Sequence, residues 1–266
     1  MALPVLGALA PWRLVFLCIG LPGLLVAALI ALTVREPTRA DAGAKATPGE
    51  FGAFLRAHPA ALAAHFGGMS LVALVMYGAM AWIPQFLHRT YAMPVPQAGL
   101  WFGIATAVCG AAGLMIGGAL ADNLYRRGHK DAHLRVIRLN AVILTPLFVG
   151  MALAPTAPVA LALMILGMLA GTIHGGVAGA ALQMIAPNRI RARLVALYFL
   201  VANLIGLGLG PTVIALVTAR VFGDDAALRY GLAIVTAVAL PLAAVILTLG
   251  LKPFARAVVA AEQRQP

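Results

Sequence analysis

The chain has 266 residues, of which 62% are hydrophobic and only 10% are charged, and its mean hydropathy is +0.97. A soluble domain has about 45–50% apolar and about 25% charged residues. This excess of apolar surface excludes a water-soluble globule and predicts a membrane protein. The net charge of +11 does not indicate a nucleic-acid-binding protein, because the basic residues lie in short clusters between apolar runs.

Seven segments are apolar for long enough to cross about 30 Å of hydrocarbon, which takes about 20 helical residues. The runs are continuously apolar and lack the alternation of barrel strands, so helices are favoured. We therefore predict an all-α integral membrane protein. Its spans are expected at 12–34, 58–88, 97–122, 136–154, 158–186, 192–219 and 229–251.

The longest connection is the polar segment 35–57, which contains Pro, Gly and several charged residues. It separates the first span from the six others, which follow one another closely. The expected parts are a first transmembrane helix at 1–34, a cytoplasmic linker at 35–57, a six-helix bundle at 58–251 and a cytoplasmic tail at 252–266.

The basic residues indicate the orientation of the spans. Only Arg13, Arg89, Arg220 and Arg229 lie at the span ends on the side opposite the C-terminus. The other 15 of the 19 follow odd-numbered spans, and the positive-inside rule therefore predicts a cytoplasmic C-terminus and an outer N-terminus. These 15 are Arg35, Arg39, Lys45, Arg56, Arg126, Arg127, Lys130, Arg135, Arg138, Arg189, Arg191, Arg193, Lys252, Arg256 and Arg264.

Glycines at four-residue spacing occur in three spans. Lipid tails are as apolar as leucine, so helices associate where small residues allow close packing. The spacing predicts flush helix contacts, which serve either as a sliding surface or as static packing. Pro84 and Pro211 are expected to bend their helices. The glycines are Gly167, Gly171, Gly175 and Gly179 in the fifth span, Gly113 and Gly117 in the third, and Gly206 and Gly210 in the sixth.

Four stretches together resemble the C-terminal part of a major facilitator superfamily transporter of the Spinster-like group. They are WRLVFLCIGLPGLLVAALIALTVREP at 12–37, WIPQFLHRTYAMPVPQAGLWFG at 82–103, GGALADNLYRR at 117–127 and IAPNRIRARLVALYFLVANLIGLGLGP at 185–211. The resemblance implies that the first span corresponds to the sixth of twelve helices in such a transporter. The five helices before it are then missing here.

GGALADNLYRR resembles the cytoplasmic loop motif of this superfamily. The resemblance implies that Asp122 pairs with arginines or with a helix N-terminus and holds one conformation shut. It departs from the motif at Asn123 and Tyr125. In the other interpretation the basic residues only anchor the topology. The residues of the expected latch are Gly118, Asp122, Arg126 and Arg127, with Arg189, Arg191 and Arg193 in the next cytoplasmic loop.

No Asp, Glu, Lys or Arg lies deep inside a predicted span, so uncharged polar side chains are the candidates for a solute site. These are Tyr77, His174, Gln183 and Asn203. The His174 imidazole could accept a proton near neutral pH, and the Asn203 amide could bind a hydroxyl or a carboxylate. Either side chain could equally form a hydrogen bond that only holds two helices together.

The resemblance implies secondary active transport of a small organic solute by alternating access, with proton coupling and no cofactor. The location would be the bacterial plasma membrane, and an N-terminal half would be the missing partner. The alternatives are a non-transporting remnant, an accessory half-subunit, or an intramembrane enzyme, for which the sequence lacks a nucleophile–base pair or a nucleotide-binding loop. His129 and His133 are four residues apart but lack further ligands, so no metal site is predicted.

Overall fold

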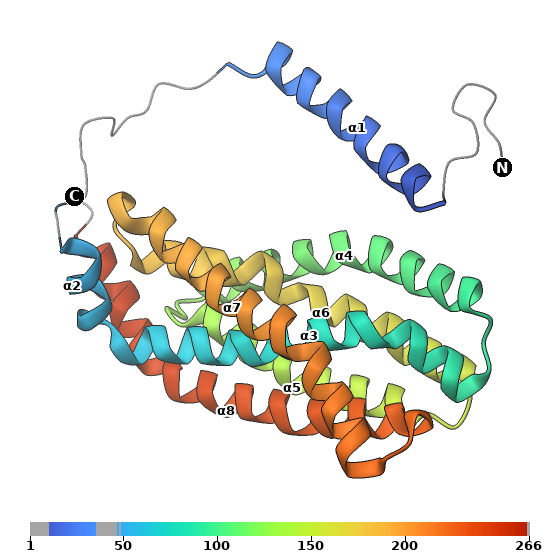
Figure 1. Cartoon of the computed structure of the whole chain (residues 1–266). Helices are drawn as coiled ribbons and strands as arrows, with labels where there is room; N and C mark the ends of the chain where they lie inside the picture. The colour runs from blue at the N-terminus through green and yellow to red at the C-terminus, as the bar shows by residue number, and fades with distance from the viewer. Residues whose placement is uncertain (1–10, 36–46, 48, 265–266) are drawn as a thin grey trace. The chain divides into compact units, whose positions relative to one another are not determined.

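The computed structural model describes residues 11–35, 47 and 49–264. The chain divides into two units, Met1–Ala44 and Lys45–Pro266. In the first unit, helix α1 runs from Pro11 to Thr33 (Figure 1). Its described side chains from Val15 onward are exposed within that unit, and it satisfies its own backbone hydrogen bonds, as lipid requires.

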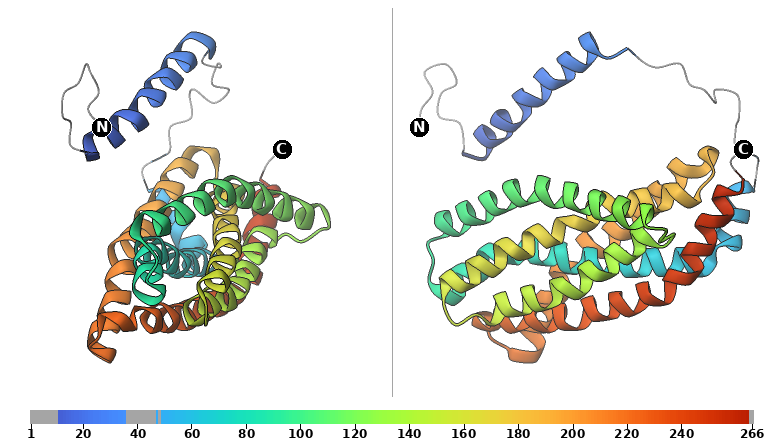
Figure 2. Two further views of the ribbon diagram at one scale, coloured as in Figure 1. Left: turned by 90° about the vertical axis from the view of Figure 1, so that its right-hand side faces the viewer. Right: turned by 180° about the vertical axis from the view of Figure 1, so that it is seen from behind.

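The second unit is built from helices joined by short turns (Figures 1 and 2). Seven helices of the described chain, α1 included, are long and apolar enough to cross a membrane, which confirms the expected fold class and number of spans. The second unit contains α2 Glu50–Ala57, α3 Pro59–Tyr91, α4 Val95–Arg126, α5 Ala132–Leu153, α6 Ala157–Ile185, α7 Asn188–Val217, the π-helical turn η1 Thr218–Phe222, the 3-10 turn η2 Asp225–Ala227, and α8 Leu228–Glu262.

Proline and residues with a left-handed backbone conformation mark where several helices begin and end. Pro59 starts α3 at a position where its missing N–H is not needed. The same helix ends at Tyr91, and the next residue, Ala92, has a φ of 53° and lies two residues before Pro94. Gly128 has a φ of 91° in the turn after α4, a conformation that glycine adopts without strain.

Helix α2 and the last part of α8 lie in segments that were expected to be outside the spans. Residues 50–57 of the expected linker form α2, whose Phe54 is buried. Helix α8 continues to Glu262, well into the segment expected as a tail. Phe254, Ala257 and Val258 are buried at helical spacing, so this last part of α8 packs against the bundle although Pro253 resembles a stop signal.

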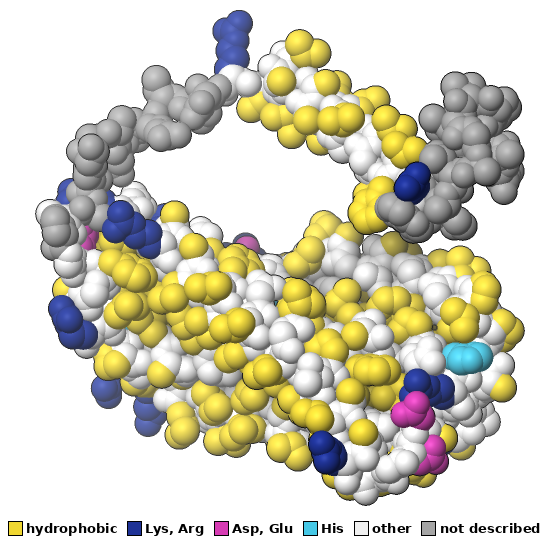
Figure 3. Space-filling model, in the orientation of Figure 1, with side chains coloured by type: hydrophobic (Ala, Val, Ile, Leu, Met, Phe, Trp, Pro, Cys, Tyr) yellow, Lys and Arg dark blue, Asp and Glu magenta, His cyan; other side chains and the backbone are white. Residues whose placement is uncertain are grey.

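Helix α3 is the centre of the second unit, where it packs against α7 and α8, and α5 lies between α6 and α8 (Figure 2). The most apolar part of α3 is 61% buried, whereas the corresponding parts of α4, α6 and α7 are only 28%, 28% and 22% buried. These three helices therefore leave most of their apolar surface without a partner in this unit. Figure 3 shows apolar side chains over the visible face and charged side chains mainly near its ends.

One end of the second unit carries the C-termini of α4, α6 and α8 and the N-termini of α5 and α7, and we call it the basic end. At the opposite end, side chains bind the free carbonyls that end α5. Arg229 donates to Ala152 O at 3.1 Å and to Ala154 O at 2.9 Å, and Tyr91 Oη donates to Ala154 O at 2.8 Å. These bonds satisfy carbonyls that have no partner within the helix.

Helices α4 and α6 approach each other at glycine. A Cβ at Gly117 would overlap the carbonyl oxygen of Ile173, and one at Gly113 would overlap the side chain of Thr172. Thr172 Oγ1 donates to Cys109 O across the same contact at 3.0 Å. The α4–α6 contact therefore requires glycine at both positions.

The four regularly spaced glycines of α6 do not form the single flush surface that the sequence suggested. Gly167 faces α5, Gly171 faces α3, Gly175 faces α4, and Gly179 has no neighbour within 4 Å in the described chain. Each step of four residues turns the helix about 40° beyond a full turn. Successive glycines along these twelve residues therefore face different neighbouring helices.

Gly117 and Gly118 provide a matched pair for testing the α4–α6 contact. Gly117→Ala should lower the stability of the bundle by about 1–3 kcal/mol, because its methyl group overlaps backbone that cannot move away cheaply. Gly118 has no neighbour within 4 Å, so Gly118→Ala should be neutral or stabilising. Thermal unfolding of both variants in detergent micelles measures the difference. Equal melting temperatures would contradict the packing described for Gly117.

Candidate functional site

Two of the four candidate residues meet across α3 and α7. Tyr77 Oη donates to Asn203 Oδ1 at 2.8 Å, and Asn203 Nδ2 donates to Phe199 O in its own helix at 2.8 Å. Both side chains are partly buried. An asparagine amide has two N–H donors and a tyrosine oxygen also accepts, so this pair keeps hydrogen-bonding capacity for a further polar group.

Glycine and proline on α7 hold the pair in place. A Cβ at Gly206 would overlap the ring of Tyr77, and one at Gly210 would overlap α3 backbone. Further along the same α3–α7 contact, Trp82 Nε1 donates to Pro211 O at 2.9 Å. Pro211 lies inside α7, where its ring removes one helical hydrogen bond. Close approach and two hydrogen bonds thus fix α3 against α7 around Tyr77.

The other expected bend residue, Pro84, lies inside α3 two residues after Trp82. Both expected bend residues are therefore near the same α3–α7 contact. A change in this contact would also move the Tyr77–Asn203 pair.

The remaining two candidates lie on α6 and do not join this pair. His174 is partly buried, and its Nδ1 atom is buried without a hydrogen-bond partner among the described residues. Gln183 is exposed. Within the described chain, neither side chain forms a hydrogen bond with Tyr77 or Asn203. The sequence predicted the residue types but not which of them meet.

His65 is a polar group that the sequence analysis missed. It is fully buried on α3, where its Nε2 lies 3.0 Å from Ala178 O of α6 and its ring is 5.0 Å from the Tyr198 ring of α7. Its Nδ1 has no hydrogen-bond partner in the described chain. The available signal in the sequence was a histidine within the apolar run 58–88.

The carboxylate of Asp122 is exposed near the end of α4. A shallow pocket of about 420 Å³ is lined by Ala119, Asp122, Tyr125 and Arg126. No basic side chain of the described residues forms an ion pair with Asp122, and the neighbouring Gly118 has no close contact there. Among the residues that the structure describes, the expected latch is therefore not closed.

The arginines expected to act with Asp122 are mostly exposed. Arg126 is the last residue of α4 and Arg127 follows it, and Arg189 and Arg193 lie on the first turns of α7. Arg191 is partly buried and donates to Ala186 O at 3.4 Å, which ties it to the turn before α7.

Tyr125, where the sequence departs from the loop motif, connects α4 to α8. Its hydroxyl donates to the carboxylate of Glu262, and Lys130 Nζ binds the same carboxylate at 2.6 Å. The Lys130 ammonium also lies 4.8 Å from the centre of the Tyr125 ring. The hydrogen bond to Glu262 raises the pKa of Lys130 because it favours the charged ammonium. These contacts anchor the last turn of α8 to the turn after α4.

Comparison with known proteins identifies the architecture. The family model described as Major Facilitator Superfamily matches residues 1–211. The chain is 28% identical over 231 residues to an MFS-type efflux pump of Mycolicibacterium smegmatis, which covers 86% of this chain and 53% of the pump. It is 34% identical over 139 residues to a Haemophilus influenzae protein named for metabolite transport, covering 52% of this chain and 32% of that protein.

Among solved structures, the fold is similar to a bacterial homologue of the human lysosomal transporter Spinster in an inward-facing, unoccupied conformation. The TM-score is 0.61 at 24% identity, and the match covers 95% of this chain and 60% of that one. The occupied form of the inward-facing homologue gives a TM-score of 0.58. The chain thus spans about half the length of the M. smegmatis pump and a third of the H. influenzae protein.

Asn203 and its neighbour Ala202 provide a test of whether the pair faces water. In a background with Cys18 and Cys109 replaced by Ser, Asn203→Cys should react with a charged, membrane-impermeant thiol reagent, because Asn203 keeps an open polar side. Ala202→Cys should stay unreactive, since Ala202 is only 5% exposed. His174→Cys should behave like Asn203→Cys. Labelling rates in membrane vesicles measure this, and an unreactive Asn203→Cys would place the pair away from any aqueous path.

Proposed function

Because this chain belongs to the Major Facilitator Superfamily, we propose that it acts in secondary active transport of a small organic solute across a bacterial plasma membrane by alternating access. The observation that carries the proposal is the Tyr77–Asn203 pair, which holds unused hydrogen-bonding groups where α3 and α7 pack together. The names of the M. smegmatis and H. influenzae relatives, an efflux pump and a metabolite transport protein, agree with a transport role.

The chain is proposed to be the C-terminal half of the transporting unit, with an N-terminal half as its partner. Helices α4, α6 and α7 leave most of their apolar surface uncovered. The chain also spans only 53% of the M. smegmatis pump, so further helices are available in that relative to cover such a surface. Alternating access needs two bundles that rock about a site between them, and one bundle alone provides only one wall.

The solute is proposed to be a polar but uncharged molecule, or one whose charge is bound by the other half. Tyr77 and Asn203 present hydroxyl and amide groups without a formal charge. Proton coupling would use the imidazoles of His65 and His174, whose Nδ1 atoms both lack partners among the described residues. In this proposal the basic end faces the cytoplasm, which places the C-terminus there.

Asp122 is proposed to close the cytoplasmic side of the transporter. Its carboxylate is exposed and forms no ion pair within the described chain. A partner could therefore come from the other half, as an arginine or as a helix N-terminus whose N–H groups attract a carboxylate. Breaking that contact would allow the two halves to separate at this end.

A flux measurement tests the transport proposal. The chain is reconstituted in liposomes alone and together with the N-terminal part of the M. smegmatis pump, and uptake of a panel of organic solutes is followed under an imposed proton gradient. The chain with the added half should transport at least one solute. Asn203→Leu should lower that flux roughly tenfold, as expected for a lost polar contact with the solute.

Thr212→Val on the same helix is the control, because among the described residues the Thr212 hydroxyl bonds only Gly208 O of α7, at 3.3 Å. Its flux should equal that of the unaltered chain. Absence of flux in both preparations would favour a non-transporting remnant. Flux that Asn203→Leu leaves unchanged would remove the Tyr77–Asn203 pair from the solute site.

A second variant tests the latch. Asp122→Asn should raise labelling of a cysteine at exposed position Gln183 by about twofold to fivefold in the two-half preparation, the size expected of one charge near a helix terminus. Asp225→Asn at the opposite end, where Asp225 pairs with Arg89 at 3.5 Å, should leave this labelling unchanged. If Asp122→Asn changes neither labelling nor flux, Asp122 has no role in closure.

A further inference from the structure

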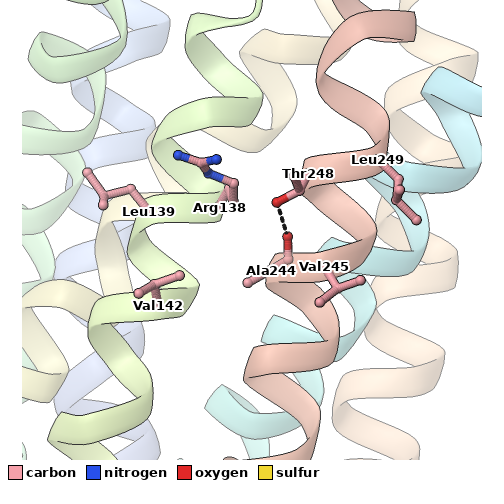
Figure 4. Close-up of a pocket in the computed structure, with 7 residues that line it drawn as sticks. All are labelled: Arg138, Leu139, Val142, Ala244, Val245, Thr248 and Leu249. Carbon is pink, nitrogen blue, oxygen red and sulfur yellow. Dashed lines mark hydrogen bonds between the residues drawn. The ribbon is translucent and has the colours of Figure 1, made fainter.

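A groove runs along α5 and α8 (Figure 4), whereas the Tyr77–Asn203 pair lies on α3 and α7. It encloses about 370 Å³ and its walls are almost entirely apolar. Side chains from both helices remain exposed there, with Val142 53%, Val245 56% and Leu249 74% exposed. The lining residues are Arg138, Leu139, Val142, Ala244, Val245, Thr248 and Leu249.

The groove has a polar and an apolar end. Figure 4 shows Arg138 and Thr248 at one level, beside Leu139 and Leu249, and only apolar side chains, those of Val142, Ala244 and Val245, below them. Arg138 lies six residues after the start of α5, about 9 Å along the helix from the basic end. The apolar end therefore reaches further into the hydrocarbon of the membrane.

The guanidinium of Arg138 has no hydrogen-bond or ion-pair partner among the described residues. The nearby acid Asp131 is already bonded to Arg135 at 2.8 Å. Thr248 Oγ1 donates its proton to Ala244 O at 2.7 Å, so it offers only an acceptor to a ligand. Lys252 is exposed one turn beyond Thr248 on the same face of α8 and adds a second cation near this end of the groove.

A ligand that satisfies this arrangement has an anionic group at one end and an apolar chain at the other. Arginine binds phosphate through two parallel N–H donors, and lysine adds a point charge. The apolar walls gain free energy by covering a hydrocarbon chain. A free phosphate would leave the walls uncovered, and a neutral lipid would leave Arg138 unpaired within the membrane, where an unpaired charge is costly.

We infer that this groove binds an anionic phospholipid, with one acyl chain between α5 and α8 and the phosphate at Arg138. The lipid comes from the leaflet at the basic end of the bundle. The site lies on a different face from the proposed solute site, so it does not depend on transport.

Native mass spectrometry of the full chain, released from detergent micelles, tests the inference. The probes are phosphatidylglycerol as the anionic lipid and phosphatidylcholine as the zwitterionic one. The unaltered chain should retain phosphatidylglycerol preferentially, at a stoichiometry of one. Arg138→Gln should weaken its retention about fivefold, the effect of one basic side chain near an anionic lipid. Arg138→Lys should restore part of it, and Arg193→Gln, on α7 and remote from the groove, should have no effect.

A second pair of variants tests the apolar walls. Val245→Trp fills the groove and should reduce phosphatidylglycerol retention, whereas Val238→Trp places the same side chain at an exposed α8 position outside the lining. The inference is overturned if Arg138→Gln and Arg193→Gln weaken retention equally, if both tryptophan variants behave like the unaltered chain, or if the two lipids are retained alike. Displacement of the lipid by inorganic phosphate alone would also overturn it.

Discussion

The structure depends on backbone-to-backbone contact between helices at glycine. In lipid, leucine gains nothing by leaving the tails of the bilayer for another helix, so attraction between helices needs short distances and local hydrogen bonds. The α3–α7 contact at Gly206 and Gly210 and the α4–α6 contact at Gly113 and Gly117 provide both. The Tyr77–Asn203 and Thr172–Cys109 hydrogen bonds form where these glycines bring the helices together. The candidate site is therefore a consequence of the packing.

Composition and the length of the apolar runs were sufficient to predict seven helices, because a spanning segment must satisfy its own backbone. The end of α8 was not predictable in this way, since Lys252 and Pro253 look like a stop while Phe254 is held by tertiary packing. The glycine faces of α6 were misjudged because four-residue spacing does not match the helical repeat.

The partners of individual polar groups could not be predicted either. Tyr77 and Asn203 are 126 positions apart, and nothing in the local sequence of either indicates the other. His65 was missed because its depth depends on how far α3 extends, and its buried contact with Ala178 arises only in the folded bundle. Residue type and approximate depth were readable from the sequence, but pairing was not.

The charged groups at the two ends of the bundle have different roles. This difference explains why a few basic residues lie at the end opposite the basic end, against the positive-inside pattern. Two of the few basic residues at the opposite end are committed: Arg229 binds the carbonyls that end α5, and Arg89 binds Asp225. Because such arginines bind groups at helix ends, their positions say little about the orientation of the protein in the membrane. At the basic end Lys130 is bound to Glu262, whereas Arg138 and Asp122 form no ion pair within the described chain. Of these two charges, Arg138 is the one that lies among apolar side chains, whereas the Asp122 carboxylate is exposed.

The two unpaired charges differ in their surroundings, and this difference determines what each can bind. Asp122 lies near the C-terminal end of α4, where its exposed carboxylate is within reach of water or of a further protein group. Arg138 lies further into its helix, between exposed valines and leucines on the α5–α8 side. A hydrated protein loop cannot reach that depth without exposing its backbone to hydrocarbon, whereas a lipid phosphate carries its own apolar chain. The same hydrocarbon solvent that makes helix contacts depend on glycine therefore also distinguishes a charge at an exposed helix end from a charge set among apolar side chains.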